Sequence, residues 1–236
     1  MKILYAGDSP AGGPANYLLA VLKSLKADFL HLPPSEILSL RFLKRPFDAI
    51  LLSDFPAKNT PATSQKAIVD QVSKGSGLLM IGGWGSFSGP FGGWRGTQIE
   101  KLLPVRLLAR DDRVNFPGGA FITLKKKHSM FRGLSFKNPP VICGLNQTRP
   151  REGSPVLLTA KRILDKKEFP LLTVDSHQRI AALATDLAPH WCGGMLDWGK
   201  VHLKLPVAQG ISIEVGDRYV EFIASLIRWL VGRGKN

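Results

Sequence analysis

Apolar residues in the first third of the chain occur in short runs, and stretches with helical spacing lie between those runs. The runs at residues 2–6, 29–32, 49–54 and 77–81 predict four strands. The run at 49–54 does not alternate with polar residues, which is typical of a strand buried on both faces. A helix is predicted after the first strand, because apolar side chains recur there every three or four positions at Tyr17, Leu18, Val21, Leu22 and Leu25.

A second helix is predicted before the fourth strand, with Thr60 as its cap and Pro61 at its first position. Its inward side chains would be Ile68, Val69 and Val72, and Gly75 would end it. Repeated strand–helix steps of this kind predict an α/β protein with a doubly wound, mostly parallel sheet.

The later part of the chain adds to this sheet. Residues 104–170 are rich in Pro, Gly and basic residues with short apolar runs, which indicates a β-rich excursion that returns to the sheet. Two adjacent strands are predicted at 171–174 and 179–184, joined at 175–178. A closing amphipathic helix is expected over 218–231, capped by Asp217 and ended by Gly232. Since no repeat or linker is visible, residues 1–236 are predicted to form a single domain.

Composition fits a globular protein, with 44% hydrophobic and 21% charged residues among 236. No apolar run reaches the roughly 18 residues of a membrane span, and the N-terminus reads as a first strand rather than a signal peptide. The two cysteines, Cys143 and Cys192, form neither a disulfide framework nor a metal-binding spacing. A cytoplasmic protein without metal or cofactor is therefore expected.

The net charge of +14 is compatible with three kinds of binding partner: nucleic acid, an anionic membrane or an acidic partner. The basic residues cluster at 106–113, 125–127 and 161–167, without the interleaved aromatic residues of a base-stacking platform or any recognised nucleic-acid motif. A basic solvated surface is favoured over nucleic-acid binding, and no membrane partner is expected.

A binding site is predicted where the strands end, because ligands of open α/β sheets bind beyond the carboxyl ends of the strands. Asp8, Asp54 and Asp186 follow three predicted strands, and the Gly82-Gly83 turn follows a fourth. Each aspartate taken singly could cap the turn after it. Together they predict one polar crevice.

Residues 187–199 form a predicted loop with an unusual content of His190, Trp191, Cys192 and Trp198. The tryptophans either face a ligand or fold the loop onto the sheet. Cys192 is expected to be packed and inert, because His190 is too close in sequence to serve as its base within one loop. The glycines at 12 and 13, before the first helix, could place amides near an anion.

Several segments resemble the class I glutamine amidotransferase-like family and its trehalose-utilisation-type relatives. They are residues 12–17, 77–84, 86–89, 96–105 and 189–191. The resemblance implies a flavodoxin-like, three-layer α/β/α sandwich. Catalytic members carry Gly-x-Cys-x-Gly at the nucleophile turn and a His-x-Glu pair near the end. Here Gly83 stands at the nucleophile position, and Cys192 takes the place of the glutamate after His190, so we expect no glutaminase activity.

Three hypotheses follow, and they leave open whether the protein is an enzyme. The first is a small polar, carbohydrate-like ligand bound by Asp8, Asp54, Gly82, Gly83, Trp84, Asp186, His190 and Trp191. The second is a hydrolase with Ser86 as nucleophile, His190 as base and Asp186 or Asp197 orienting the base. The third is a basic interaction protein or a homo-oligomer, carried by the middle segment and the basic clusters.

Overall fold

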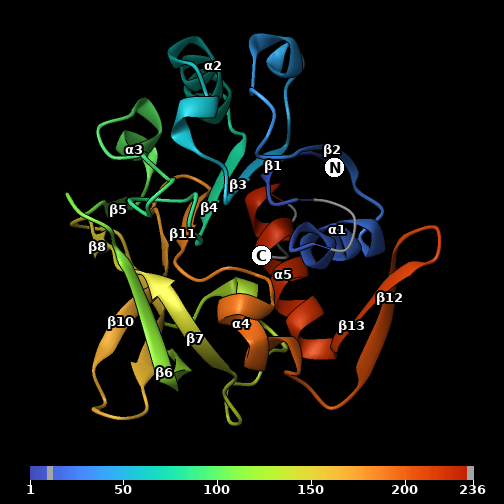
Figure 1. The fold of residues 1–236 in the computed structure, drawn as a ribbon, viewed down its shortest axis with the longest axis vertical. Helices are drawn as coiled ribbons and strands as arrows, with labels where there is room; N and C mark the ends of the chain where they lie inside the picture. Colours follow the sequence, from blue (N-terminus) through green and yellow to red (C-terminus); the bar gives the residue numbers. More distant parts are fainter. Residues whose placement is uncertain (10–12, 233–236) are drawn as a thin grey trace.

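A nine-stranded sheet forms the centre of the computed structural model, which describes residues 1–9 and 13–232. Its strand order is β2-β1-β3-β4-β11-β10-β9-β6-β7 (Figure 1). The first five strands run parallel: β2 (Asp28–Leu32), β1 (Lys2–Gly7), β3 (Ala49–Ser53), β4 (Gly77–Ile81) and β11 (Ile180–Leu183). The carboxyl ends of these strands therefore meet at one edge, where the binding site was predicted.

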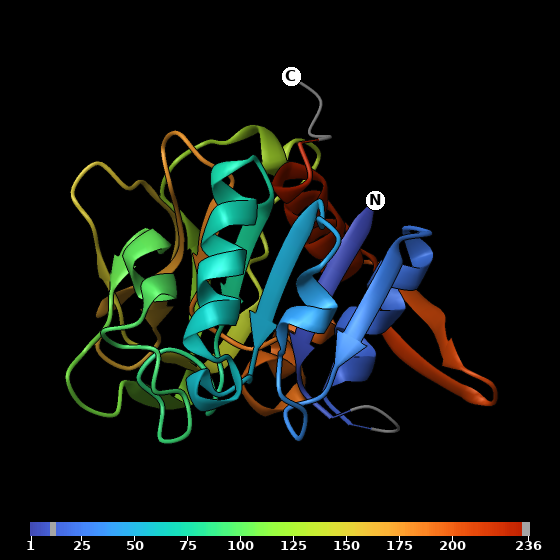
Figure 2. The same ribbon diagram turned by 90° about the horizontal axis from the view of Figure 1, so that it is seen from above.

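Helices cover both faces of the parallel strands. Successive residues of a strand point to opposite faces of the sheet, so that Leu4 and Tyr5 pack into two separate cores. The core on the Tyr5 side packs under α1 (Ala15–Ser24) and α5 (Asp217–Leu230). The other core packs under α2 (Ala62–Ser73) and α3 (Gln98–Leu102), so that α2 and α5 lie on opposite sides in Figure 2. The predicted flavodoxin-like α/β/α sandwich is confirmed.

The middle of the chain returns to the sheet, as predicted. Its strands continue the sheet in antiparallel pairs: β6 (Arg113–Leu124), β7 (Val141–Asn146), β9 (Val156–Arg162) and β10 (Glu168–Val174). Strand β10 also pairs with β11 in the predicted hairpin, with Leu172 opposite Leu183. The short strands β5 (Val105–Arg106) and β8 (Arg149–Pro150) pair beside the sheet. The described residues also form three short 3₁₀ helices: η1 (Leu40–Leu43), η2 (Ala57–Asn59) and η3 (Ser129–Phe131).

Some elements differ from the prediction. Pro61 is the N-cap of α2 rather than its first residue, and the buried Thr60 hydroxyl forms no hydrogen bond among the described atoms. Helix α5 begins at Asp217 with Gly216 as its cap. The predicted loop 187–199 contains a helix, α4 (Pro189–Leu196), which was missed because its two adjacent glycines lower helix propensity.

The chain also forms a hairpin that the sequence analysis did not predict. Strands β12 (His202–Ala208) and β13 (Ile211–Gly216) pair with each other alone and extend beside α1 (Figure 1). Across residues 1–9 and 13–232, no helix is both long and apolar enough to cross a bilayer.

Candidate ligand-binding cavity

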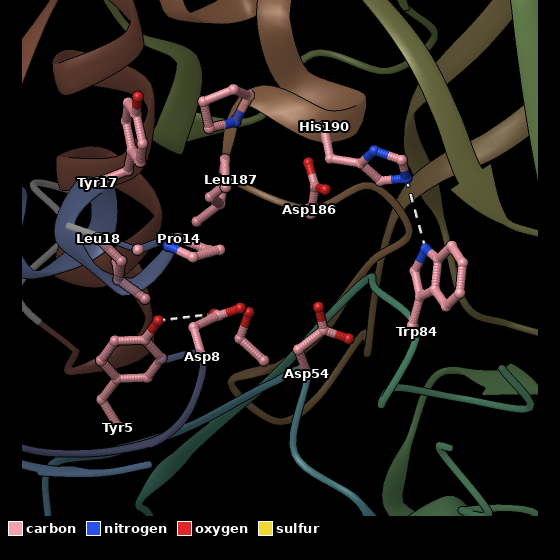
Figure 3. Close-up of a pocket in the computed structure, with 14 residues that line it drawn as sticks. Tyr5, Asp8, Pro14, Tyr17, Leu18, Asp54, Trp84, Asp186, Leu187 and His190 are labelled. Carbon is pink, nitrogen blue, oxygen red and sulfur yellow. Dashed lines mark hydrogen bonds between the residues drawn. The ribbon is translucent and has the colours of Figure 1, made fainter. Parts of the chain in front are cut away.

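A cavity of about 520 Å³ opens at the carboxyl ends of the parallel strands. We call it the aspartate cavity, because Asp8, Asp54 and Asp186 all line it (Figure 3). The other lining residues are Tyr5, Gly13, Pro14, Tyr17, Leu18, Ser53, Trp84, Leu187, Ala188, Pro189 and His190. The volume is in the range of small-molecule sites.

Asp8 and Asp54 reach the cavity through the same local geometry. Each follows the last residue of a strand, and each has a left-handed backbone, with φ of 45° and 49°. Aspartate tolerates this conformation better than most residues. The Asp8 amide donates to the carbonyl of Ser53 at 3.1 Å, which ties the two strand ends together. Tyr5 donates its hydroxyl proton to Asp8 Oδ2 at 2.7 Å.

Asp54 lies in a cradle formed by the turn after β4. The Gly85 amide donates to Asp54 Oδ1. Gly83 has φ of 148°, and a Cβ there would lie 2.2 Å from Asp54 Oδ1. Gly82 is equally restricted, since its Cβ would lie 2.1 Å from the carbonyl oxygen of Ala184. Both glycines position the strand end, and neither lines the aspartate cavity.

This cradle predicts that two glycine substitutions differ in how much they destabilise the protein. Gly83→Ala introduces both backbone strain and overlap with Asp54, whereas Gly96→Ala, at φ of 80° with no atom within 4 Å, introduces strain alone. We expect Gly83→Ala to destabilise the protein by about 2 kcal/mol more than Gly96→Ala. Urea unfolding of both variants measures the difference. Equal losses of stability in the two variants would contradict the predicted overlap between a Cβ at position 83 and Asp54.

Ser86 does not take part in the aspartate cavity. Its side chain is buried, and its Oγ accepts a hydrogen bond from the Asp54 amide at 3.0 Å. The hydrolase hypothesis requires a hydrogen bond between Ser86 and His190. The described hydrogen bonds instead join Ser86 Oγ to the Asp54 amide and His190 Nε2 to the Trp84 indole. Asp197, the alternative orienting group, is an exposed residue at the end of α4 with His202 as its neighbour at 3.9 Å.

The three cavity carboxyl groups hold their protons unusually strongly. Burial, together with the charge of Asp54, raises the pKa of Asp8 to about 7. Burial also raises the pKa of Asp54. The pKa of Asp186 is raised to about 8 by burial and by the charges of Asp54 and Asp8. The charge of Asp54 thus acts on both Asp8 and Asp186, and the charge of Asp8 acts on Asp186, which joins the three carboxyl groups in one electrostatic cluster.

Asp186 has one oxygen without a partner. Its Oδ2 accepts from the Trp191 amide at 3.3 Å, while Oδ1 is buried and has no hydrogen-bond partner among the described residues. The residue is only 8% exposed. A buried, unpaired carboxyl oxygen costs free energy unless a ligand or water supplies a donor.

An aromatic rim stands beside the aspartate cavity. Trp84 is 43% exposed, and its indole N–H donates to His190 Nε2 at 3.4 Å. The guanidinium of Arg113 lies over the Trp84 ring, 4.1 Å from its centre, and also pairs with Asp111 at 2.7 Å. Phe91 stacks near Trp84 with ring centres 6.4 Å apart. Trp84 is thereby held as a rigid wall.

Trp191 was predicted to contact the ligand, and the structure places it elsewhere. It is buried, its indole donates to Asn115 Oδ1 at 2.9 Å, and its ring covers Gly144, where a Cβ would lie 2.3 Å from Nε1. Trp198 is buried as well. The alternative explanation, that the tryptophans fold this segment onto the sheet, is the one observed. Cys192 is packed in the core, and Cys143 is exposed on β7.

The sequence analysis missed several residues around the aspartate cavity. Tyr5 and Tyr17 line it but were counted only among apolar positions, although a tyrosine hydroxyl inside an apolar run signals a polar neighbour. Asn146 supports the Gly83 backbone through two hydrogen bonds, and no local pattern indicated this. Of the glycines expected to bind an anion, Gly13 lines the aspartate cavity, and Gly12 lies outside the described residues.

The described residues offer no cluster of three or more His, Cys, Asp or Glu side chains arranged to hold a metal ion. The three aspartates are therefore spread around the aspartate cavity rather than focused on one point.

A family model described as "Putative glutamine amidotransferase" matches residues 15–205. The chain belongs to this family. No curated protein matches this glutamine amidotransferase-like sequence. The resemblance found in the sequence is confirmed, and family membership by itself identifies neither the ligand nor the reaction.

Solved structures share the fold of this glutamine amidotransferase-like protein. The cytoplasmic protein STM3548 of Salmonella typhimurium is 24% identical, with a TM-score of 0.74 over 96% of this chain and 98% of that one. The cytoplasmic protein STM1381 of the same species is 23% identical, with a TM-score of 0.72 over the full length of both. A ThuA-like protein of Bacteroides uniformis is 14% identical, with a TM-score of 0.58 over 100% of this chain and 93% of that one.

Proposed function

We propose that this glutamine amidotransferase-like protein binds a small polar, carbohydrate-like ligand in the aspartate cavity. The observation that carries the proposal is that three carboxyl groups face one cavity and one of them, Asp186, has a buried oxygen without a donor. Carboxylates accept hydrogen bonds from hydroxyl groups, and a rigid tryptophan provides a flat apolar surface for a sugar ring.

We propose further that the protein has no glutaminase activity. That reaction needs a thiolate beside a base. Gly83 stands at the position of the nucleophile, and neither cysteine is among the residues that line the aspartate cavity. Burial raises the pKa of the Cys192 thiol well above its usual value, which disfavours the thiolate. His190 lies at the rim, where it contacts Trp84 rather than a thiol.

Thermal unfolding in the presence of monosaccharides and polyols tests the proposed binding. A ligand at one hundred times its Kd stabilises the folded state by about 2.7 kcal/mol, which raises the Tm by several degrees. We expect Asp54→Asn and Trp84→Ala to remove this rise. Lys125→Ala should retain it, because Lys125 pairs with Glu168 outside the aspartate cavity.

Two results would overturn the proposal. One is a panel in which no compound raises the Tm of the native protein. The other is a compound whose stabilising effect is the same in the native protein, Asp54→Asn and Trp84→Ala, since that compound would bind elsewhere.

A further inference from the structure

The aspartate cavity carries acidic groups without a matching basic side chain. Among the described residues that line it, none is Lys or Arg, although the chain has 32 such residues and a net charge of +14. Its ionisable liners are Tyr5, Asp8, Tyr17, Asp54, Asp186 and His190. Arg113, which lies over the Trp84 ring, already pairs with Asp111.

Of the described lining residues, His190 is the one whose side chain can carry a positive charge, and its charge acts on Asp54, where it lowers the pKa. The indole N–H of Trp84 points to His190 Nε2 at 3.4 Å. The pKa values of Asp8 and Asp186 are raised by burial and by the charges of neighbouring aspartates. Asp8 and Asp186 are therefore the carboxyl groups of the aspartate cavity that a cationic group of a ligand would pair with.

The geometry also limits what kind of cation would fit. The acidic groups do not form a metal-ligand cluster among the described residues, so a single small ion is a poor match. Leu18, Leu187 and Pro14 provide apolar wall between the acidic groups, which suits a carbon skeleton. The unpartnered Asp186 Oδ1 needs a hydrogen-bond donor inside the aspartate cavity.

We infer, on the basis of the proposed function, that the ligand is a small polyol bearing a primary ammonium group, as in an amino sugar. The ammonium contributes three donors and one positive charge to the aspartates that a neutral sugar leaves uncompensated. The hydroxyl groups bind the remaining carboxyl oxygens, and the carbon skeleton packs between the apolar wall and Trp84.

Matched pairs of compounds test this inference. Each pair differs by one group, an ammonium in place of a hydroxyl: 2-amino-2-deoxyglucose and 6-amino-6-deoxyglucose with glucose, and 1-amino-1-deoxyglucitol with glucitol. Isothermal titration calorimetry at pH 8 measures each Kd. We expect at least one amine to bind at least tenfold more tightly than its hydroxyl parent.

The matched variants are Asp186→Asn and the surface substitution Asp70→Asn. Asp70 pairs with Lys66 on the exposed side of α2, with a side chain that is 51% exposed. Asp186→Asn should reduce the preference for the amine at least tenfold, measured as the ratio of the Kd of the parent sugar to the Kd of its amine, so that a loss of affinity shared by both compounds does not count. Asp70→Asn should leave both affinities unchanged. Thermal unfolding without ligand checks that both variants are folded.

The outcomes separate this inference from the proposed function. If neutral sugars bind as tightly as their amines, or more tightly, the inference that the ligand bears an ammonium group is wrong and the proposed function stands. A preference for amines that persists in Asp186→Asn also overturns the inference. If neither the amines nor any neutral polyol binds, the inference and the proposed function both fail.

Discussion

The free energy of unfolding of the ligand-free protein should fall by about 3–6 kcal/mol between pH 5 and pH 8. In the unfolded chain, Asp8 and Asp186 lose their protons near the usual aspartate pKa of 3.8, whereas in the folded protein their pKa values are about 7 and about 8. The folded state therefore binds more protons in this window, and stability decreases as the pH rises. Urea unfolding at intervals of pH measures the slope.

The double variant Asp8→Asn, Asp186→Asn isolates the cause. It should flatten the slope and be more stable than the native protein at pH 8, because it removes two desolvated charges. The surface variant Asp70→Asn should keep the native slope. Stability that is constant or rises between pH 5 and pH 8 in the native protein would show that these carboxyl groups are not buried together.

Replacing Asn146 with leucine should destabilise the protein by about 3–5 kcal/mol. Asn146 is fully buried and links β7 to the turn after β4. Its side chain accepts from the Gly83 amide at 2.8 Å and donates to the Gly83 carbonyl at 3.1 Å and to Asp112 Oδ1 at 2.7 Å. Leucine has a similar size but leaves the Gly83 amide and Asp112 Oδ1 without this partner, at roughly 1–3 kcal/mol each. Among the described hydrogen bonds, the Gly83 carbonyl keeps only the longer one from the Ser86 amide, at 3.4 Å.

The same substitution should raise the pKa of Asp112. Burial already raises that pKa to about 6, and the hydrogen bond from Asn146 lowers it. The exposed Asn138→Leu is the matched control and should change stability by less than about 0.5 kcal/mol. A loss for Asn146→Leu as small as that of the control would mean that the network does not support the Gly83 turn.

The parallel half of the fold was predictable because its signals are local. Strands buried on both faces lack alternation, and their aspartate and glycine ends follow directly, so β1, β3 and β4 and the position of the site could be read from short windows. The predicted residues Asp8, Asp54, Trp84, Asp186 and His190 line the aspartate cavity, and their role in ligand binding stays a prediction.

The residues whose role the sequence analysis misassigned or missed depend on contacts between segments that are distant in sequence. Trp191 was assigned to the ligand because nothing nearby indicated that Gly144, 47 residues earlier, leaves room for its ring. Ser86 was considered a nucleophile because it lies near the turn after β4, whereas its hydrogen bond with the Asp54 amide, 32 residues away in sequence, has no local signal. Asn146 was overlooked for the same reason. Long-range complementarity of this kind leaves no periodic pattern in one sequence.

The central claim is that three aspartates from separate strand ends share one desolvated cavity. Carbon-13 NMR of the aspartate carboxyl groups, assigned by the single variants Asp8→Asn, Asp54→Asn and Asp186→Asn, tests it directly. We expect native midpoints of about 7 for Asp8 and about 8 for Asp186, each shifting downward when a neighbouring aspartate is replaced. Three independent titrations near pH 4 would contradict the account.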